Sequence, residues 1–431
     1  MARIRPFQGL RYRVVDGDAA NLLAPPYDVV DAGGRAELAA RSEDNCIRVI
    51  LPEGEGDAKY GEGAAQFQRL IREALVQDET PGVYVYHQRF EHEGRTFVRR
   101  GFVSLIELTR FGQGPVLPHE RTLSGPKEDR LKLMRACDAH LELVFGLFSD
   151  PDQRWEASVE AALGAAVMDC EFDGAHHTLY RVTDPSAVES LQGVLADRNI
   201  YIADGHHRFE TMCTFGDELA EGGRGEGASR WGMIYLSNLD DDGLVVRPTH
   251  RIVHGLDAVD LGAALDAVRP FFDIDEVDLP ATVDSLLEGL RAHAEQGATF
   301  GLVEPGTGRV HRLRLKADFD PAAAGLASLP EALQRLDVAL LHELILERAL
   351  GITKEAQAAK TNLRYFKSSE AALRVARDGG DGTQLVCFMN ATPVSDVVAV
   401  CDSGEVMPQK STFFYPKIPT GLVFHRLSNE G

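Results

Sequence analysis

The pattern of apolar and polar positions predicts a chain in which short strands alternate with helices. The clearest boundary follows the apolar run at residues 200–203, which is cut at once by Asp204 and Gly205. Helical spacing of apolar residues then runs from 209 to 219. A strand, a glycine turn and a helix in this order leave the unpaired N–H groups of the helix N-terminus directed out of the turn. We take this corner as the centre of the predicted fold.

Periodicity predicts further elements along the chain. Glu93-Gly94 supplies the chemistry of a hairpin turn. Helices are expected at residues 35–40, 64–76, 154–166, 185–197, 261–268, 283–293, 329–350, 368–377 and 394–400, and strands at 83–86, 96–108, 141–148, 177–182, 231–239, 299–303, 310–315 and 385–390. These elements predict a mixed α/β fold. We expect a main domain at 1–255, a smaller inserted subdomain at 256–325, and a C-terminal segment at 326–431 that returns to the site.

The polar residues of the central corner have the chemistry of an anion site. Gly205 allows a sharp reversal and a close approach of a ligand to the backbone, and the following helix directs N–H groups at a negative charge. Arg208 can clamp a phosphate or carboxylate, while Asp204 can hold a metal ion such as Mg²⁺ or accept a proton from a hydroxyl. The alternative is an ordinary turn with Asp204 as a helix cap and His206 and His207 in solvent. Five such residues in a row favour the ligand site.

A second charged cluster lies on both sides of a predicted helix start near residue 126. His119, Glu120 and Arg121 precede that start, and Lys127 and Arg130 follow it. The alternative is structural, because acids in the first turn of a helix complement its dipole. In so acidic a chain, however, a gathering of cations and metal ligands favours a second wall of a phosphate site. Glu120 is then a candidate catalytic acid.

Two irregular segments supply further candidates. Asp28 follows consecutive prolines, which fix the backbone, and is either a catalytic acid or part of a structural corner. Near the C-terminus, Lys410, Ser411 and Lys417 are either phosphate contacts or part of a structural clasp. The spacing before Lys410 is close to that of a P-loop, but Gln409 replaces the second glycine, so we reject a true P-loop.

Composition and charge narrow the classes of function. The chain has 45 basic and 66 acidic residues, and its formal net charge of −21 opposes binding to nucleic acid or to anionic membranes. Any polyanionic ligand must therefore be met by locally clustered cations. The six cysteines form no C-x-x-C pair, and no stretch has the character of a signal peptide or a membrane span. We expect a cytoplasmic protein, in which the predicted helix at 329–350 is either an organiser of the core or a homodimer face.

The turn from Ala203 to Arg208 resembles the phosphate-binding turn of the ParB/sulfiredoxin-like superfamily, which includes archaeal free-serine kinases with a similar Asp-Gly-His-x-Arg turn. Over nearly its whole length the chain also resembles the family known as domain of unknown function 1015. That second resemblance rests on the segments 24–29, 119–122, 127–130, 248–251 and 407–417. Together they imply a ParB/sulfiredoxin-like turn within a larger mixed-sheet domain, with serine as the leading substrate.

Three functions remain open. The first is a phosphotransferase that uses ATP or ADP with Mg²⁺ to phosphorylate a hydroxyl of a small molecule. Such chemistry needs hydrogen-bond donors around the phosphates, cations, and an acidic side chain that orients the attacking hydroxyl. The second is a metal-dependent hydrolase with His119, Asp204, His206 and His207 as ligands and Glu120 as base. The third is a non-catalytic nucleotide or anion sensor, which would tolerate the loss of Asp204.

Overall fold

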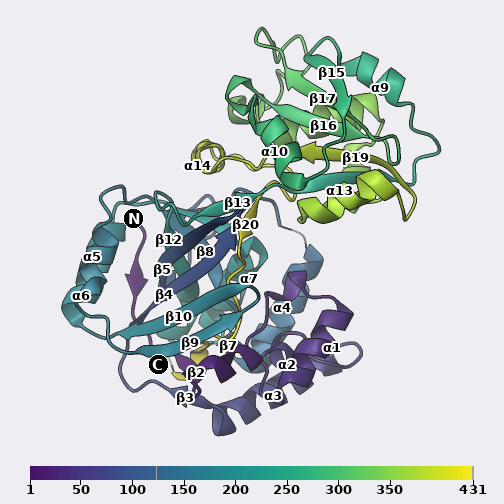
Figure 1. Cartoon of the computed structure of the whole chain (residues 1–431). Coiled ribbons are helices and arrows are strands. Elements are labelled where there is room, and N and C mark those ends of the chain that lie inside the picture. The colour runs from purple at the N-terminus through teal and green to yellow at the C-terminus, as the bar shows by residue number, and fades with distance from the viewer. Residues whose placement is uncertain (123, 430–431) are drawn as a thin grey trace. The chain divides into compact units, whose positions relative to one another are not determined.

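The computed structural model describes residues 1–122 and 124–429, and two large sheets organise separate parts of the chain (Figure 1). Unit 1 comprises Met1–Pro118, Thr122–Val245 and Pro416–Gly431, and unit 2 comprises His119–Arg121 and Val246–Tyr415. The expected boundaries at 255 and 325 differ from these, because strands before and after residue 325 pair in one sheet.

Unit 1 is built on a mixed sheet. Among the described residues it has nine strands in the order β6-β11-β8-β12-β5-β4-β10-β9, with β1 paired to β5. Strand β11 is parallel to β6 but antiparallel to β8, and β8 is parallel to β12. The strands are β1 (Ile4–Arg5), β4 (Val83–His92), β5 (Arg95–Glu107), β6 (Val116–Leu117), β8 (Val144–Phe148), β9 (Ala166–Phe172), β10 (Ala175–Val182), β11 (Ile200–Asp204) and β12 (Trp231–Asn238), with the small pairs β2 (Leu10–Tyr12) to β3 (Leu75–Gln77) and β7 (Ala139–His140) to β21 (His425–Arg426).

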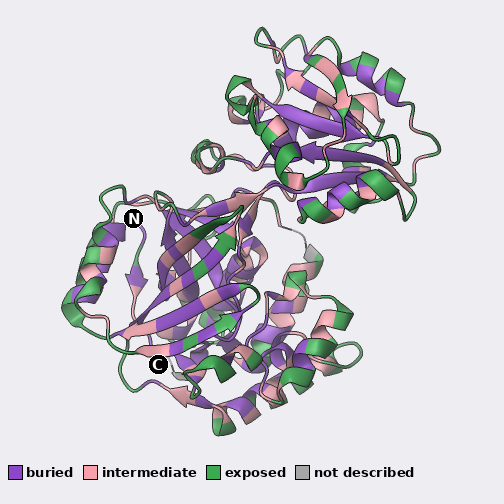
Figure 2. Ribbon diagram, in the orientation of Figure 1, coloured by how far each residue is buried: buried purple, intermediate pink, exposed green. Residues whose placement is uncertain are grey.

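Helices cover this sheet and share its core. Helix α4 packs against both α7 and α3, and α5 packs against α6 (Figure 1). Phe102, Phe148, Trp155, Leu191 and Phe209 belong to one buried cluster. Figure 2 shows the central strands as buried and the outer face of α5 as exposed. The helices are η1 (Gly17–Asn21), η2 (Tyr27–Val29), α1 (Ala32–Arg41), α2 (Ile47–Ile50), α3 (Ala58–Glu73), α4 (Ser124–Cys137), α5 (Arg154–Glu160), α6 (Pro185–Leu195), α7 (His206–Glu221), α8 (Glu226–Ser229) and η6 (Leu427–Asn429).

Unit 2 is built on an antiparallel sheet in the order β15-β17-β16-β19-β14-β18. Leu286, Leu290 and Leu373 from two helices, α10 and α13, form a buried cluster with Val386 and Phe388 of the sheet. Its elements are β14 (His250–His254), α9 (Leu261–Val268), β15 (Phe272–Asp278), α10 (Val283–Arg291), η3 (Ala294–Gln296), β16 (Thr299–Val303), β17 (Arg309–Leu315), η4 (Glu331–Leu333), α11 (Asp337–Leu340), the π-helix η5 (Leu341–Ala349), α12 (Lys354–Ala359), β18 (Leu363–Phe366), α13 (Ser369–Asp378), β19 (Thr383–Met389), α14 (Val394–Asp402) and β20 (Phe413–Tyr415), and β13 (Val245–Arg247) spans the boundary between the units.

Local chemistry explains where several elements begin and end. Glu93 and Gly94 both have positive φ, 50° and 71°, as the tight hairpin between β4 and β5 requires, so the predicted hairpin is confirmed. Pro185 occupies the first turn of α6, where its missing N–H costs nothing, and Asp184 accepts from the Ser186 N–H at 2.8 Å.

The helix expected at 329–350 differs in the structure. It is divided into η4, α11 and η5, because Leu336 has an extended backbone (ψ 125°) and interrupts the helical path. The expectation of a homodimer face on this segment stays a prediction. Among the described residues, none of the helices combines the length and the apolar character that crossing a membrane demands.

Candidate functional site

The central corner of unit 1 has the predicted strand–turn–helix geometry. Asp204 is the last residue of β11, and Gly205 turns the chain into α7 with φ +90°. A Cβ at Gly205 would lie only 2.9 Å from Arg208 Nε, so glycine is required by both the backbone angle and the space. Gly205 is the N-cap residue of α7 and contributes no side-chain cap hydrogen bond. The first turn of the helix therefore presents its positive dipole end without a built-in acceptor from the cap residue.

Asp204 joins two cations. Its Oδ1 lies 2.7 Å from Lys417 Nζ, and its Oδ2 lies 2.6 Å from Arg208 Nη2. The side chains of Asp204, Lys417 and Arg208 are only 19%, 13% and 7% exposed. Arg208 Nη1 also donates to the carbonyl of Leu143, which fixes the guanidinium over the turn. Two cations thus share one carboxylate, and the trio has a net charge of +1.

The protonation state of Asp204 follows from these neighbours. Burial by itself raises the pKa of the carboxyl, but Lys417 and Arg208 outweigh burial and hold the pKa well below its usual value. Burial likewise lowers the pKa of Arg208, whereas Asp204 raises it, and the net result is a raised pKa. Asp204 and Arg208 are therefore both charged at neutral pH. A carboxylate held this strongly in its ionised form is a weak proton acceptor.

Lys417 reaches the turn because the backbone before it is fixed to the sheet. Arg99 Nη2 donates to the carbonyl of Pro416 at 2.6 Å, and Gln88 Nε2 donates to the carbonyl of Lys417 at 3.1 Å. Both Arg99 and Gln88 are fully buried. Asp204 is near enough to Arg99 to oppose the lowering of its pKa by burial. Arg99 is thus a third cation near Asp204, and the sequence analysis missed it.

Other predicted residues of unit 1 lie around the corner in different settings. His206 is buried, with its ring 6.4 Å from that of Phe111, whereas His207 is half-buried. Asp28 is exposed in η2 and is close enough to Arg208 to raise the pKa of that guanidinium. The exposed position of Asp28 leaves its carboxylate accessible to a ligand.

Lys127 does not extend to the turn. Its Nζ lies 3.1 Å from the carboxylate of Glu210, one turn further along α7, and Thr122 donates to the same carboxylate. These contacts join α4 to α7. In this arrangement Lys127 helps to position the helix that begins at Gly205.

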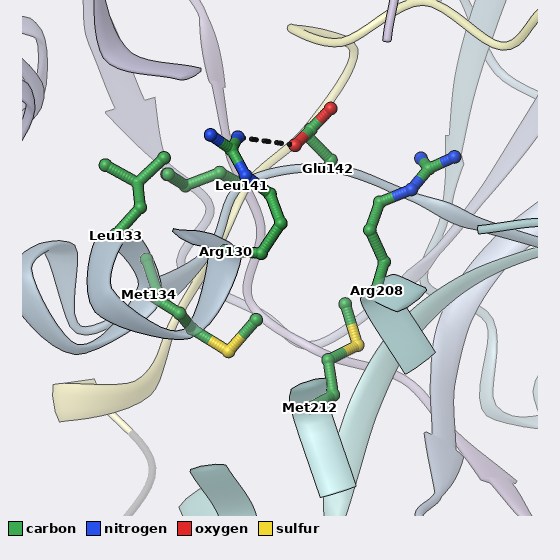
Figure 3. A pocket seen from close by; sticks show the side chains of 8 residues that line it. Arg130, Leu133, Met134, Leu141, Glu142, Arg208 and Met212 are labelled. Carbon is green, nitrogen blue, oxygen red and sulfur yellow. Dashed lines mark hydrogen bonds and ion pairs between the residues drawn. The ribbon is translucent and has the colours of Figure 1, made fainter. Parts of the chain in front are cut away.

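Arg130 is held inside unit 1. Its guanidinium lies 2.6 Å from Asp129 and 3.3 Å from Glu142, and it stacks 4.2 Å above the ring of Tyr27. Figure 3 shows Arg130 directed at Glu142 beside a cavity of about 20 Å³ that Arg208 also lines. A cavity of that volume has room for about one water molecule. Arg130 therefore supports the segment that precedes Asp28 and does not face a space large enough for a nucleotide.

The remaining predicted residues belong to unit 2. His119 is buried, with Nε2 2.8 Å from Thr412 Oγ1, and its carbonyl accepts the N–H of Met407 at 2.8 Å. Arg121 is exposed. The segment at 119–121 is therefore bound to the loop around residue 407, which the sequence also singled out.

Glu120, Lys410 and Ser411 lie in that same loop contact. Glu120 Oε1 accepts the N–H of Lys410 at 3.4 Å, and Lys410 has a left-handed backbone, with φ +59°. Ser411 is buried and donates its hydroxyl to the carbonyl of Pro408 at 2.5 Å. The predicted residues thus form two clusters, one in each unit. Their convergence on one site stays a prediction.

The residues offer little support for a metal centre. Over residues 1–122 and 124–429, no group of three or more His, Cys, Asp and Glu side chains is arranged to hold a metal ion. Each oxygen of Asp204 already lies within 2.7 Å of a cation. A Mg²⁺ ion at this carboxylate would have to share its oxygens with two cations that repel it, so the arrangement disfavours Asp204 as a magnesium ligand.

The sheet, the glycine turn and the ionised trio define a mixed α/β protein with a charged strand–turn–helix corner. The chain belongs to the family described as "Protein of unknown function (DUF1015)", whose profile matches residues 4–339. No curated protein matches the chain significantly.

Solved structures show a distant similarity. "Conserved hypothetical protein from Pyrococcus furiosus" is 13% identical, with a TM-score of 0.35 over 74% of this chain and 94% of that one. "Free serine kinase in complex with AMP" is 14% identical, with a TM-score of 0.34 over 74% and 90%. "SbnI with C-terminal truncation from Staphylococcus aureus" is 7% identical, with a TM-score of 0.35 over 76% and 88%. Similarity at this level does not transfer an activity to this chain.

Proposed function

We propose that this protein is a nucleotide-dependent small-molecule kinase of the cytoplasm, which transfers a phosphoryl group from ATP or ADP to a hydroxyl, with free serine as the leading acceptor. One observation carries the proposal: α7 begins at Gly205, which brings no side chain of its own to cap the helix, beside Arg208 and Lys417, both anchored on Asp204. The resemblance of this turn to a phosphate-binding turn supports the same conclusion.

The corner has the parts that phosphate binding requires. Backbone N–H groups of residues 205–208 at the start of a helix favour an anion. Arg208 adds a planar fork of donors and Lys417 a point charge. The net charge of +1 on the trio, in a chain with a net charge of −21, attracts an anionic ligand to this place in particular.

In this proposal Asp204 orients the phosphate contacts and does not remove a proton. Its lowered pKa disfavours proton transfer, whereas its ion pairs hold two cations ready for the charge that develops on the transferred group. Such preorganised charges account for a large part of catalysis in phosphoryl transfer. Asp28, which is exposed near Arg208, is the better candidate in unit 1 for the carboxylate that accepts the hydroxyl proton. Glu120 is the second candidate.

The donor nucleotide would arrive as its Mg²⁺ complex, with the ion held by phosphate oxygens, since the carboxylate of Asp204 is engaged by cations. His119, Arg121, Lys410 and Ser411 stay proposed phosphate contacts from unit 2.

The test is a two-stage assay on the whole purified chain. Thermal-shift and calorimetric titrations with ADP and ATP, each with Mg²⁺, measure binding. Product detection then measures phosphate transfer to serine, other hydroxyl amino acids and polyols. We expect nucleotide binding and transfer to at least one acceptor. Binding without transfer to any acceptor would favour the sensor, and absence of nucleotide binding would refute the proposal.

A further inference from the structure

Unit 2 contains a cavity of about 350 Å³ within its own residues. The volume is near the lower end of those that hold small ligands, roughly 300–1,000 Å³. Its lining includes the apolar side chains of Leu329, Leu333 and Met407 and the aromatic ring of Tyr365. Of the residues that line this cavity, the kinase proposal uses only Arg121.

A rare helix forms part of the wall. The π-helix η5 places His342 and Glu343 at the cavity. Helices of this type are uncommon and occur frequently at functional sites. His342 Nδ1 lies 2.7 Å from Gln357 Oε1, and Arg251 Nη2 lies 3.4 Å from His342 Nε2. Because arginine can only donate, His342 accepts at Nε2 and donates from Nδ1, which fixes its tautomer and the cavity wall.

Behind this wall lies a buried positive charge. Arg251 is fully buried, and among the described residues no carboxylate lies within ion-pair distance of its guanidinium. Its Nε also lacks a hydrogen-bond partner. Burial lowers the pKa of Arg251 to about 10, which leaves the group charged at neutral pH. Glu120 opposes part of this lowering of the pKa, and the buried cation favours a further negative charge nearby.

Further cations lie beside the same wall. Burial lowers the pKa of Lys360, and the neighbouring Lys410 lowers it further, whereas Glu120 raises it. The cation at Lys354 is already paired with Glu343 at 2.9 Å. Arg121 lines the cavity and makes no hydrogen bond or ion pair within the described part of the chain. A ligand in the cavity can therefore pair with Arg121 without breaking an existing hydrogen bond or ion pair.

We propose that this cavity is a second ligand site, which binds a small organic anion with an apolar, preferably aromatic body and one carboxylate or phosphate group. The body lies against Leu333, Met407 and Tyr365. The anionic group meets Arg121 and the field of Arg251. Gln409, which also lines the cavity, supplies an amide for hydrogen bonding.

The test uses the full chain and three probes of similar shape: phenyl phosphate, benzoate and the neutral benzamide. Ligand-observed NMR titration gives their dissociation constants. We expect both anions to bind at least tenfold more tightly than benzamide. Their ratio distinguishes a phosphate site from a carboxylate site.

Two substitutions on α12 form a matched pair. Ala358 is exposed and lines the cavity, so Ala358→Trp fills it, whereas Ala359→Trp alters the adjacent exposed residue outside the lining. We expect Ala358→Trp to weaken the binding of the anionic probes at least tenfold and Ala359→Trp to leave their binding unchanged. Arg121→Gln should remove the preference for anions over benzamide. Equal binding in wild type and Ala358→Trp, or no preference for anions, would overturn the proposal. Because Ala358 and Ala359 are not among the proposed nucleotide contacts, the outcomes of these two substitutions are independent of nucleotide binding at Asp204.

Discussion

At the scale of single residues, the candidate site depends on the charge of Asp204. It is the one carboxylate in ion-pair contact with both Arg208 and Lys417 among the described residues. Removing one member of a buried pair leaves the other charges without compensation, which is costly. The partial exposure of Asp204 reduces that cost through solvent screening.

We predict that Asp204→Asn lowers the free energy of unfolding by roughly 2 kcal/mol at pH 7. Because folding lowers the pKa of Asp204, its contribution is complete above the unfolded pKa of about 4 and is lost as the pH falls towards the folded value. The free energies of unfolding of wild type and variant, measured with urea, should therefore converge as the pH falls below 4. Asp44→Asn is the control, since Asp44 pairs with Arg69 at a more exposed position and should change stability by less than about 1 kcal/mol. A wild-type advantage that persists unchanged below pH 3 would contradict the assignment.

Gly205 provides a second test at this scale. Gly205→Ala should destabilise the protein by about 1–3 kcal/mol, because the residue has φ +90° and its Cβ would contact Arg208. Gly193→Ala, in the last turn of α6 with open space around it, should be neutral or stabilising by about 1 kcal/mol. Thermal unfolding of the two variants gives the comparison. Equal changes in stability would contradict the claim that the backbone at residue 205 requires glycine.

At the scale of elements, the sequence predicted what local chemistry determines. The hairpin at Glu93-Gly94 and the corner at Asp204-Gly205 were predictable, because turn residues and periodicity act over a few positions. The π-helix η5 was not, since its apolar spacing also suits an ordinary helix. One feature of the sequence pointed to Arg99. Arg99 and Arg100 are consecutive on a strand, so their side chains lie on opposite faces of the sheet, and one of them must face inward.

Lys417 supplies a prediction about the start of α7. Lys417→Met keeps the length of the side chain but removes the charge beside the helix N-terminus. We expect nucleotide affinity to fall more than tenfold by calorimetry, the scale of one charge-assisted contact. Lys59→Met is the control, because Lys59 pairs with Asp129 at the same 2.7 Å in another part of unit 1. A similar loss in both variants would indicate a general charge effect and would remove Lys417 from the site.

The start of α11 carries a pH-dependent destabilisation. Burial, with a further contribution from Asp396, raises the pKa of Asp337 to about 7. A raised carboxyl pKa makes the fold less stable once the group ionises, so the penalty is present above about pH 7 and disappears below the unfolded pKa of about 4. Asp337→Asn should therefore stabilise the protein by roughly 3 kcal/mol at pH 8 and have little effect at pH 4. Denaturant unfolding at the two pH values tests this, and an equal effect at both would count against it.

At the scale of the whole molecule, pairing between distant strands limits prediction. Strands β16 and β19 pair across the expected boundary at residue 325, and periodicity carries no information about such partners. The return of Lys417 to Asp204 has the same cause, since it depends on Arg99 and Gln88 holding the distant backbone at residues 416–417. The sequence thus indicated the chemistry of the corner but not the full set of residues that builds it.

The central claim is that the Asp204 corner performs phosphoryl transfer and does more than bind an anion. The most direct measurement pairs nucleotide affinity by calorimetry with the rate of phosphate transfer, on wild type and Asp204→Asn. Asparagine preserves the shape but not the charge that positions Arg208 and Lys417 in the transition state. We predict nucleotide binding within a few-fold of wild type and a turnover lower by about 10²-fold or more. Equal turnover in the two proteins would contradict the claim, as would a wild type that binds nucleotide but transfers phosphate to no acceptor.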